Sequence, residues 1–330
     1  MKEFHGNFAL SQLLEFPGKR ALRIAVAEKN VALQQLAREG FRFALSAKVR
    51  RAFYDLLAAQ KIVGLRQNQV DSATTFMQAA SKRAESGYGS DFETIKSRAD
   101  LIAAQRELLE SRGKVATARI TLNTLLGRAP GTPLTVAGTL EGVAPRSNAA
   151  ENFTALAMAR NPSLRVLGLQ AESAGLTLRA TRFGTRPDFA VGPQLEYTRS
   201  EQIIGLGVTV QLPLWNQKLG EIATVTAEQQ KILAEIEKTR LEITGAVNRS
   251  AENLRVAQEQ LALYTPAFLD ALRTFLSQAE RSYAQNATTL IIYLDAKRTY
   301  FDAMSQYYRS LGAVAEQRAE LEAAVGVPLD

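Results

Sequence analysis

Apolar residues recur at helical spacing over unusually long stretches of this chain. From Lys19 to Ser86 there is no proline, and only two glycines interrupt the pattern. A helix of that length would form a rod of about 100 Å. After a Gly-rich turn the pattern resumes and predicts a second helix up to Leu126, with Gly127 as its C-terminal signal. Ser90 or Asp91 can cap that helix, with Glu93 in its first turn.

The second half of the chain repeats this theme after an irregular connector over residues 128–147, rich in Pro, Gly and Thr. Two shorter helices are predicted over residues 150–160 and 163–183, divided by Asn161-Pro162. A second long helix is predicted from Gly220 to about Ala284, kinked at Pro266. A last helix ends at Gly326.

Residues Asn7 to Phe16 read as a short strand, and strict alternation of apolar with small or polar residues marks two further segments between the helical regions. Phe189–Tyr197 and Ile204–Leu212 form a period-2 hairpin with one apolar face. In the second strand the apolar positions are Ile204, Leu206, Val208, Val210 and Leu212. Such a face packs on a core in a soluble sandwich, or faces lipid in a membrane barrel.

A repeat relates the two halves at an offset of about 199 residues. One seam comprises Leu101, Ala104, Leu108, Ser111, Val115, Ala118, Leu122 and Leu125, and the other Tyr300, Ala303, Tyr307, Ser310, Val314, Gln317, Leu321 and Ala324. Each copy reads as a strand, a long helix, a turn and another helix. The predicted fold class is mainly α with a small β part, built on long helical hairpins.

The amino-acid composition excludes several kinds of functional site. The 330 residues include no Cys and one His, His5, which excludes disulfides, thiolate metal sites and His clusters within one chain. We predict no enzyme, catalytic residue, metal ligand or cofactor. The net charge is +7, but Lys and Arg are interleaved with Glu, as on solvated helix faces, so nucleic-acid binding is not predicted. No apolar run reaches the roughly 18–20 residues of a membrane-spanning helix.

In this order, these segments resemble the TolC-type outer-membrane efflux proteins, the exit ducts of tripartite pumps. The resemblance is carried by Asn161-Pro162-Ser163-Leu164, Gln170-Ala171-Glu172, Arg186-Pro187-Asp188 and Leu212-Pro213-Leu214-Trp215-Asn216, with the two turns and their helices. The junctions Gly18-Lys19-Arg20 and Lys218-Leu219-Gly220-Glu221-Ile222 look most like the heavy-metal branch, which serves cobalt–zinc–cadmium or copper–silver pumps.

The resemblance implies a homotrimer whose copies each give four strands to a twelve-stranded transmembrane β-barrel, with helices forming a periplasmic tunnel. Its partners would be outer-membrane lipid, a periplasmic adaptor and an inner-membrane RND pump. Only three strands are visible, so we expect the family's first strand, first helices and signal peptide to precede Asn7. We expect a first repeat (1–127), an equatorial connector (128–186) and a second repeat (187–330).

The resemblance also assigns functional positions to the helix turns. The tips that meet the adaptor would be Arg83, Gly87, Tyr88, Gly89 and Ser90, with Arg281, Gln285, Asn286 and Ala287 as the second, looser copy. The gate would use Glu93, Tyr283 and Asp295, the last as a ring of carboxylates around the axis. Ile292 and Thr288 replace a second ring aspartate and a gate arginine of some members.

Two alternatives remain open from the sequence. A periplasmic adaptor also has a long helical hairpin, but only one, flanked by Gly-rich β modules. A soluble coiled-coil scaffold would not explain the alternation from Phe189 to Leu212.

Overall fold

The computed structural model describes residues 6–87, 90–140, 150–197, 202–212, 215 and 217–329. The chain divides into two compact units, Met1–Gly40 with Arg160–Glu242 and Phe41–Ala159 with Ile243–Asp330. Helices α1 (Lys19–Glu85) and α5 (Leu219–Ala262) contribute to both units. Among the described helices, none combines the length and hydrophobicity needed to cross a membrane.

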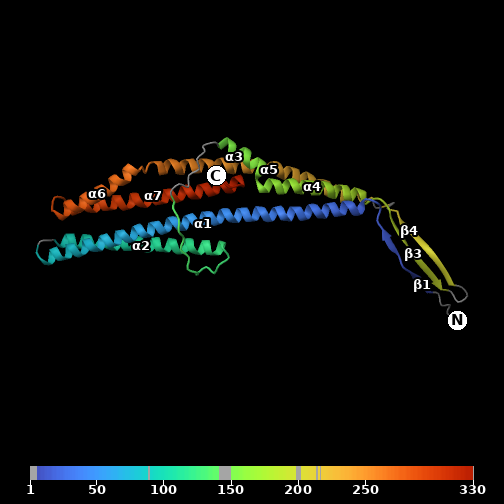
Figure 1. Ribbon diagram of the computed structural model, residues 1–330, viewed down its shortest axis with the longest axis horizontal. Coiled ribbons are helices and arrows are strands. Elements are labelled where there is room, and N and C mark those ends of the chain that lie inside the picture. Colours follow the sequence, from blue (N-terminus) through green and yellow to red (C-terminus); the bar gives the residue numbers. More distant parts are fainter. Residues whose placement is uncertain are drawn as a thin grey trace. The chain divides into compact units, whose positions relative to one another are not determined.

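The first unit contains one antiparallel sheet. Strand β3 (Asp188–Tyr197) pairs with β4 (Gln202–Gln211) along its whole length and with β1 (Gly6–Ala9) and β2 (Gln12–Leu14) (Figure 1). The predicted β-hairpin is therefore confirmed. Its turn falls at residues 198–201, outside the described part of the chain.

The strand predicted over Asn7–Phe16 is present in two pieces, β1 and β2, and the second ends at Leu14. The register against β3 is the same in both pieces, so no residue is inserted between them. The interruption lies opposite Pro193. The Leu10 amide donates to the Pro193 carbonyl over 3.1 Å, but proline has no N–H to donate in return, and the ladder is lost there.

A compact polar and aromatic junction joins this sheet to the helices of the same unit. The Asp188 carboxylate accepts a hydrogen bond from the Phe16 amide (2.8 Å) and lies 2.9 Å from Lys19 Nζ. The Arg186 guanidinium lies 3.9 Å from the ring centroid of Phe183, at the end of α4 (Pro162–Phe183). Gly18 adopts φ +101° against Phe183, a conformation that suits glycine.

Local signals predict most helix boundaries correctly. Asn161 caps α4, accepting from the Ser163 amide over 2.9 Å, with Pro162 in the first turn. Helix α3 (Ala150–Arg160) precedes it, as predicted. In the second unit, Ser90 caps α2 (Asp91–Leu125) by accepting from the Glu93 amide.

The predicted kink at Pro266 is wrong, because the helix breaks there. Helix α5 ends at Ala262, and α6 (Pro266–Ala284) begins anew with Thr265 as its cap, accepting from the Phe268 amide over 3.2 Å. Proline cannot donate to a preceding turn, and its ring clashes with the carbonyl four residues back. A side-chain cap directly before it makes a new helix start more favourable than a bend.

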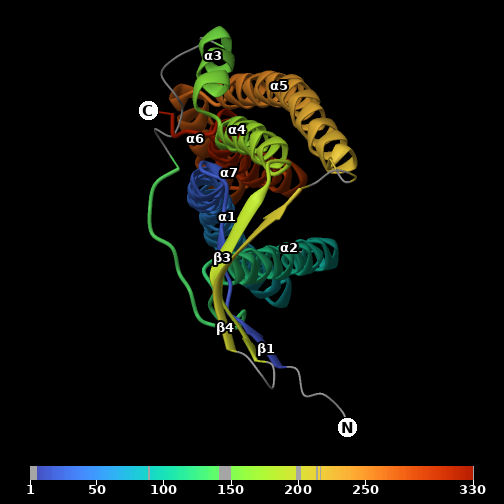
Figure 2. The ribbon, with the colours of Figure 1, turned by 90° about the vertical axis from the view of Figure 1, so that its right-hand side faces the viewer.

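The second unit is built around the later part of α1. In the view of Figure 1 the helices α6, α7 (Leu290–Val325), α1 and α2 follow one another, and the end-on view of Figure 2 shows α7 beside α1. Helix α7 also contacts α2, through an ion pair between Lys297 and Asp100. The first predicted seam is the contact face of α2, where Ala104, Leu108, Ser111, Ala118 and Leu122 are buried. Cores lie along α1: Leu56 packs with Leu122, Leu65 with Phe301, and Phe76 with Tyr293.

Helix α7 is buried over a wider face than its predicted seam, since Leu311, Gly312 and Ala315 are buried as well as Val314 and Leu321. This fits its position between α6 and α1. The internal duplication and the domain limits drawn from it stay predictions, because each compact unit combines segments of both proposed repeats.

Gly312 should be intolerant of any side chain. A Cβ added there would lie 2.8 Å from Ala58 Cβ on α1. We expect Gly312→Ala to destabilise the fold by about 1–3 kcal/mol through overpacking, measured by thermal unfolding. The matched control is Gly64→Ala in α1, where nothing lies within 4 Å of an added Cβ and a small stabilisation is expected. Equal effects at both positions would contradict this packing.

Candidate functional site at the helix turns and the sheet face

The turn between α6 and α7 lies beside the end of α1 through one specific contact. Arg83 Nη2 donates to Asn286 Oδ1 over 2.8 Å. Asn286 can stand at this turn because it adopts φ +56°, a left-handed conformation that asparagine tolerates better than most residues. Gly87 has φ +76° in the other turn, while Tyr88 and Gly89 lie outside the described residues. The structure therefore brings members of both predicted tips together.

The remaining tip residues lie on the surface. Ser90, Arg281, Gln285 and Ala287 are exposed. Ser90 and Gln285 also have local roles, as caps of α2 and α6. Nothing in the geometry shows what binds these positions, so adaptor contact stays a prediction.

Behind the tips, three aromatic rings from three helices form the core of the predicted gate. Tyr283 on α6 stacks on Tyr293 on α7 with ring centroids 5.5 Å apart, and Phe76 on α1 lies 5.3 Å from Tyr283. The Arg83 guanidinium lies 5.8 Å from the centroid of the Tyr283 ring. The aromatic cluster, meaning these three rings, thus joins both hairpins directly beside the Arg83–Asn286 contact.

Glu93 and Tyr283, predicted as gate partners, are neighbours. Burial raises the pKa of the Tyr283 hydroxyl, the negative charge of Glu93 raises it further, and Arg83 partly opposes the shift. The hydroxyl is buried and makes no hydrogen bond of normal geometry with the described residues. Glu93 therefore acts on this hydroxyl mainly through its charge. Asp295 is exposed on α7, and a ring of such residues would require further copies of the chain.

The sheet presents a wide apolar surface. In β4, the side chains of Ile204 and Leu206 are 78% and 74% exposed. The register places Ile204 beside Leu195 and Leu206 beside Pro193, so both strands put apolar residues on the same face. Phe8 in β1, opposite Leu195, is 72% exposed and extends it. Other exposed apolar members of this face are Leu10, Leu14, Val208, Val210 and Leu212.

Sequence reasoning missed two buried basic residues between the hairpins. Lys297 on α7 is 2% exposed and its Nζ lies 2.8 Å from Asp100 Oδ2 on α2. Arg66 on α1 is 7% exposed and its Nη1 lies 2.9 Å from Glu107 Oε2 on α2. Helical spacing could have indicated that Lys297 is buried, because Lys297 follows the buried Tyr293 by four residues and so lies on the same helix face.

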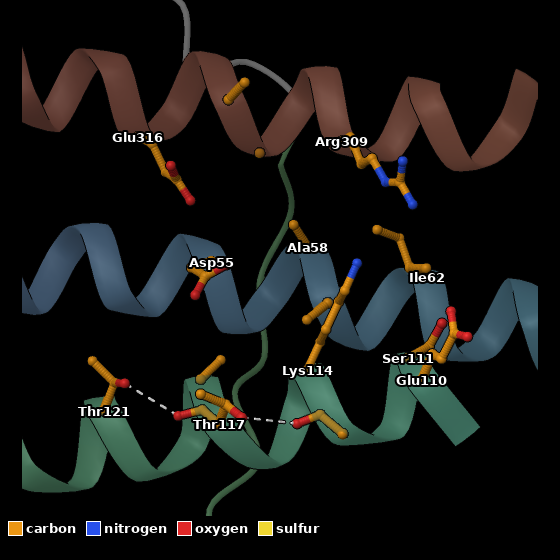
Figure 3. Close-up of a pocket in the computed structure, with 15 residues that line it drawn as sticks. Asp55, Ala58, Ile62, Glu110, Ser111, Lys114, Thr117, Thr121, Arg309 and Glu316 are labelled. Atoms are coloured by element: carbon orange, nitrogen blue, oxygen red, sulfur yellow. Dashed lines mark hydrogen bonds between the residues drawn. The ribbon is translucent and has the colours of Figure 1, made fainter. Parts of the chain in front are cut away.

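A groove lies between α1, α2 and α7 within the second unit, with a volume of about 760 Å³ (Figure 3). Asp55 on α1 and Glu316 on α7 lie on its walls, and burial raises the pKa of both carboxyl groups. Lys114 and Arg309 add positive charge. Among the described residues, no group of three or more His, Cys, Asp or Glu side chains could hold a metal ion.

A protein family and two individual proteins are similar to this chain in sequence. The family described as "Outer membrane efflux protein" matches residues 1–128 and 154–327. The cobalt-zinc-cadmium resistance protein CzcC of Cupriavidus metallidurans is 26% identical, over 95% of this chain and 75% of that protein. The pyoverdine export outer membrane protein OpmQ of Pseudomonas putida is 22% identical, over 98% of this chain and 69% of that protein.

Solved structures share the fold. CusC superposes with a TM-score of 0.76 at 13% identity, covering 99% of this chain and 83% of that one. The Campylobacter jejuni outer membrane channel CmeC gives a TM-score of 0.75 at 12% identity, covering 98% and 78%. At these identities the likeness shows that the long hairpins and the small sheet are a fold used by outer-membrane channels.

Tyr293 provides a pH-dependent test of the aromatic cluster. Burial raises its pKa to about 12 from an ordinary value of 10. A tyrosine whose pKa is raised in the folded state favours folding fully below pH 10, and loses that contribution as the pH rises through 12. We expect a late step of tyrosinate absorbance near pH 12, coincident with loosening of the fold, and its loss in Tyr293→Phe. Replacement of the exposed Tyr197 by Phe is the control. A step near pH 12 of unchanged size in Tyr293→Phe would contradict the assignment.

Proposed function

The chain belongs to the outer membrane efflux protein family, and from this premise we propose that it works as a homotrimeric exit duct for metal cations. Members of the family are outer-membrane channels of tripartite efflux systems rather than enzymes, and this chain is such a channel. Membership of this family rules out the two alternatives left open by the sequence, a periplasmic adaptor and a soluble coiled-coil scaffold. The specific points proposed are the trimer, its contacts, the gate and the cargo.

The sheet supports assembly into a barrel. Strands β3 and β4 have 10 residues each, about the length that a tilted strand needs to cross a bilayer. Among the described residues, no further strand pairs with β4 or with β1 and β2, the two outer edges of this sheet. Unpaired edge groups within lipid would cost several kcal/mol each. Closure with the sheets of neighbouring copies removes those edges, and the apolar face then lies against lipid.

The helices of the second unit support the same assembly. Ile95, Ile102 and Leu109 on α2 are exposed at intervals of seven residues, opposite the buried seam of that helix. Phe268 and Phe275 on α6 are exposed at the same interval. In the view of Figure 1, α6 and α2 are the first and last of the helices α6, α7, α1 and α2. The α2 seam of one copy would pack on the α6 seam of the next, and a head-to-tail contact of this kind forms a ring when the rotation between copies closes the circle.

The turns support contact with an adaptor. The first turn joins α1 to α2, and the second joins α6 to α7. Arg83, beside the first turn, donates a hydrogen bond to Asn286 in the second. A partner that displaced this exposed hydrogen bond would pull directly on the Tyr283–Tyr293 stack. We propose that adaptor binding at the tips and release of the gate are linked in this way, with an RND pump supplying the cargo.

The proposed cargo rests on CzcC, whose name describes cobalt, zinc and cadmium resistance. A ring of three Asp295 carboxylates would concentrate cations and repel anions at the gate by focused potential. Transport through such a duct would be passive, because the ring acts on the ions only through its electrostatic potential.

Single-channel recording of the purified protein in planar bilayers tests this function. We expect cation-selective pores, and a several-fold lower cation-over-anion permeability ratio in Asp295→Asn. Asp270→Asn on α6 removes an exposed carboxylate paired with Arg273 and serves as the control. Failure of the wild-type protein to form pores would contradict the duct, while an unchanged ratio in Asp295→Asn would discard only the ring.

A further inference from the structure

The most unusual side chain in the second unit is Lys297. It is 2% exposed, the largest of the fully buried side chains in the described residues. Lysine is almost never buried to this extent unless it is paired, because a lone ammonium group in the interior is strongly unfavourable. Its partner is Asp100 on α2, 2.8 Å away, whose side chain is 25% exposed. The ammonium group of the pair is therefore buried between the helices, while its carboxylate is partly exposed to solvent.

The position of this pair connects both hairpins. Lys297 follows Ala296, which is fully buried in the core cluster of Phe76, Tyr293 and their neighbours. Asp100 lies close enough to Tyr293 for its charge to contribute to that hydroxyl's raised pKa. One ion pair thus fixes α7 to α2 behind the aromatic cluster, two residues along α7 from Asp295.

A second ionic contact crosses the same helices farther from the turns. Arg66 on α1 makes an ion pair of 2.9 Å with Glu107 on α2, and its Nη2 lies 3.7 Å from Asp302 on α7. Gln69 accepts a further hydrogen bond from Arg66 over 2.7 Å. Asp302 lies five residues after Lys297, so the two contacts hold successive turns of α7.

Apolar packing alone would leave α7 some freedom to slide and rotate. A buried ion pair has one good geometry, because any displacement leaves a charge without its partner. Buried polar groups are best documented in this role, where they fix the register of packed helices. Lys297 and Arg66 therefore constrain both the height and the rotation of α7, and with them the direction of Asp295.

We propose that Lys297 is a positioning residue for channel closure. With Arg66 it forms a two-point ionic clamp that sets the register of α7 on the α1–α2 hairpin and so the position of Asp295 in the bore. The consequence for conduction rests on the proposed duct, whereas the register of α7 does not. The clamp is distinct from the tip contact of Arg83, since it is buried and lies behind the aromatic cluster.

The test combines a leak measurement with a direct probe of α7. Lys297→Met removes the charge at similar length, and the exchange variant Lys297→Asp with Asp100→Lys restores a pair of opposite sign. In assembled trimers we expect Lys297→Met to raise the leak through closed channels on the order of tenfold, and the exchange to return it most of the way. Lys231→Met is the control, because Lys231 and Glu228 form an exposed pair within α5.

A nitroxide on Ile292→Cys reports the motion of α7 without requiring a pore, since Ile292 is 54% exposed and the chain has no other Cys. We expect greater label mobility in Lys297→Met and recovery in the exchange variant. Unchanged leak and mobility, with only a lower melting temperature, would show a structural role and overturn the proposal. If wild-type protein formed no pores while the mobility changes occurred, the duct would fail and the clamp would stand.

Discussion

The whole arrangement depends on apolar surface that one copy of this chain cannot bury. Helix α2 uses one face against α1 and still exposes Ile102 and Leu109 on the opposite side. The sheet has one face on which residues such as Leu206 are mostly exposed. Contiguous apolar surface of this kind marks contact with another protein or with a membrane. The exposed residues of α2 recur at coiled-coil spacing, which suits contact with another helix, and those of the sheet recur at strand spacing, which suits contact with lipid. The proposed ring of copies, with its strands in an outer membrane, would cover both surfaces.

The polar contacts between the hairpins become more buried with distance from the turns. The Arg83–Asn286 hydrogen bond at the turns is exposed, so water competes with it and it contributes little net stability. The Lys297–Asp100 pair is mostly buried, and removal of either partner would strand a charge. Between them lies the Tyr283–Tyr293 stack. The end that would meet a partner is thus the easier one to open, while the buried end keeps α7 in register.

The sequence predicts the elements well where the signal is local. Caps such as Asn161 and Ser90 act within three residues, and the α2 seam follows from helical spacing alone. Pairing partners are not local, so the break between β1 and β2 could not be foreseen without knowing that Leu10 faces Pro193. Pro266 predicts an interruption of the helix, but whether the helix bends or breaks there depends on the competing cap at Thr265. A lysine such as Lys297 is expected on a solvated surface unless its helix face is known to be buried on two sides.

Cysteine cross-linking between copies tests most directly that neighbours cover these seams. The chain has no Cys, so Ile102→Cys and Phe275→Cys introduce the only thiols. They lie on exposed faces of α2 and α6, which belong to two different helical hairpins. Mild oxidation of the double variant in membranes should give covalent dimers and trimers and nothing larger, and neither single variant should give trimers. Monomers alone, or a ladder that continues beyond three copies, would contradict the account.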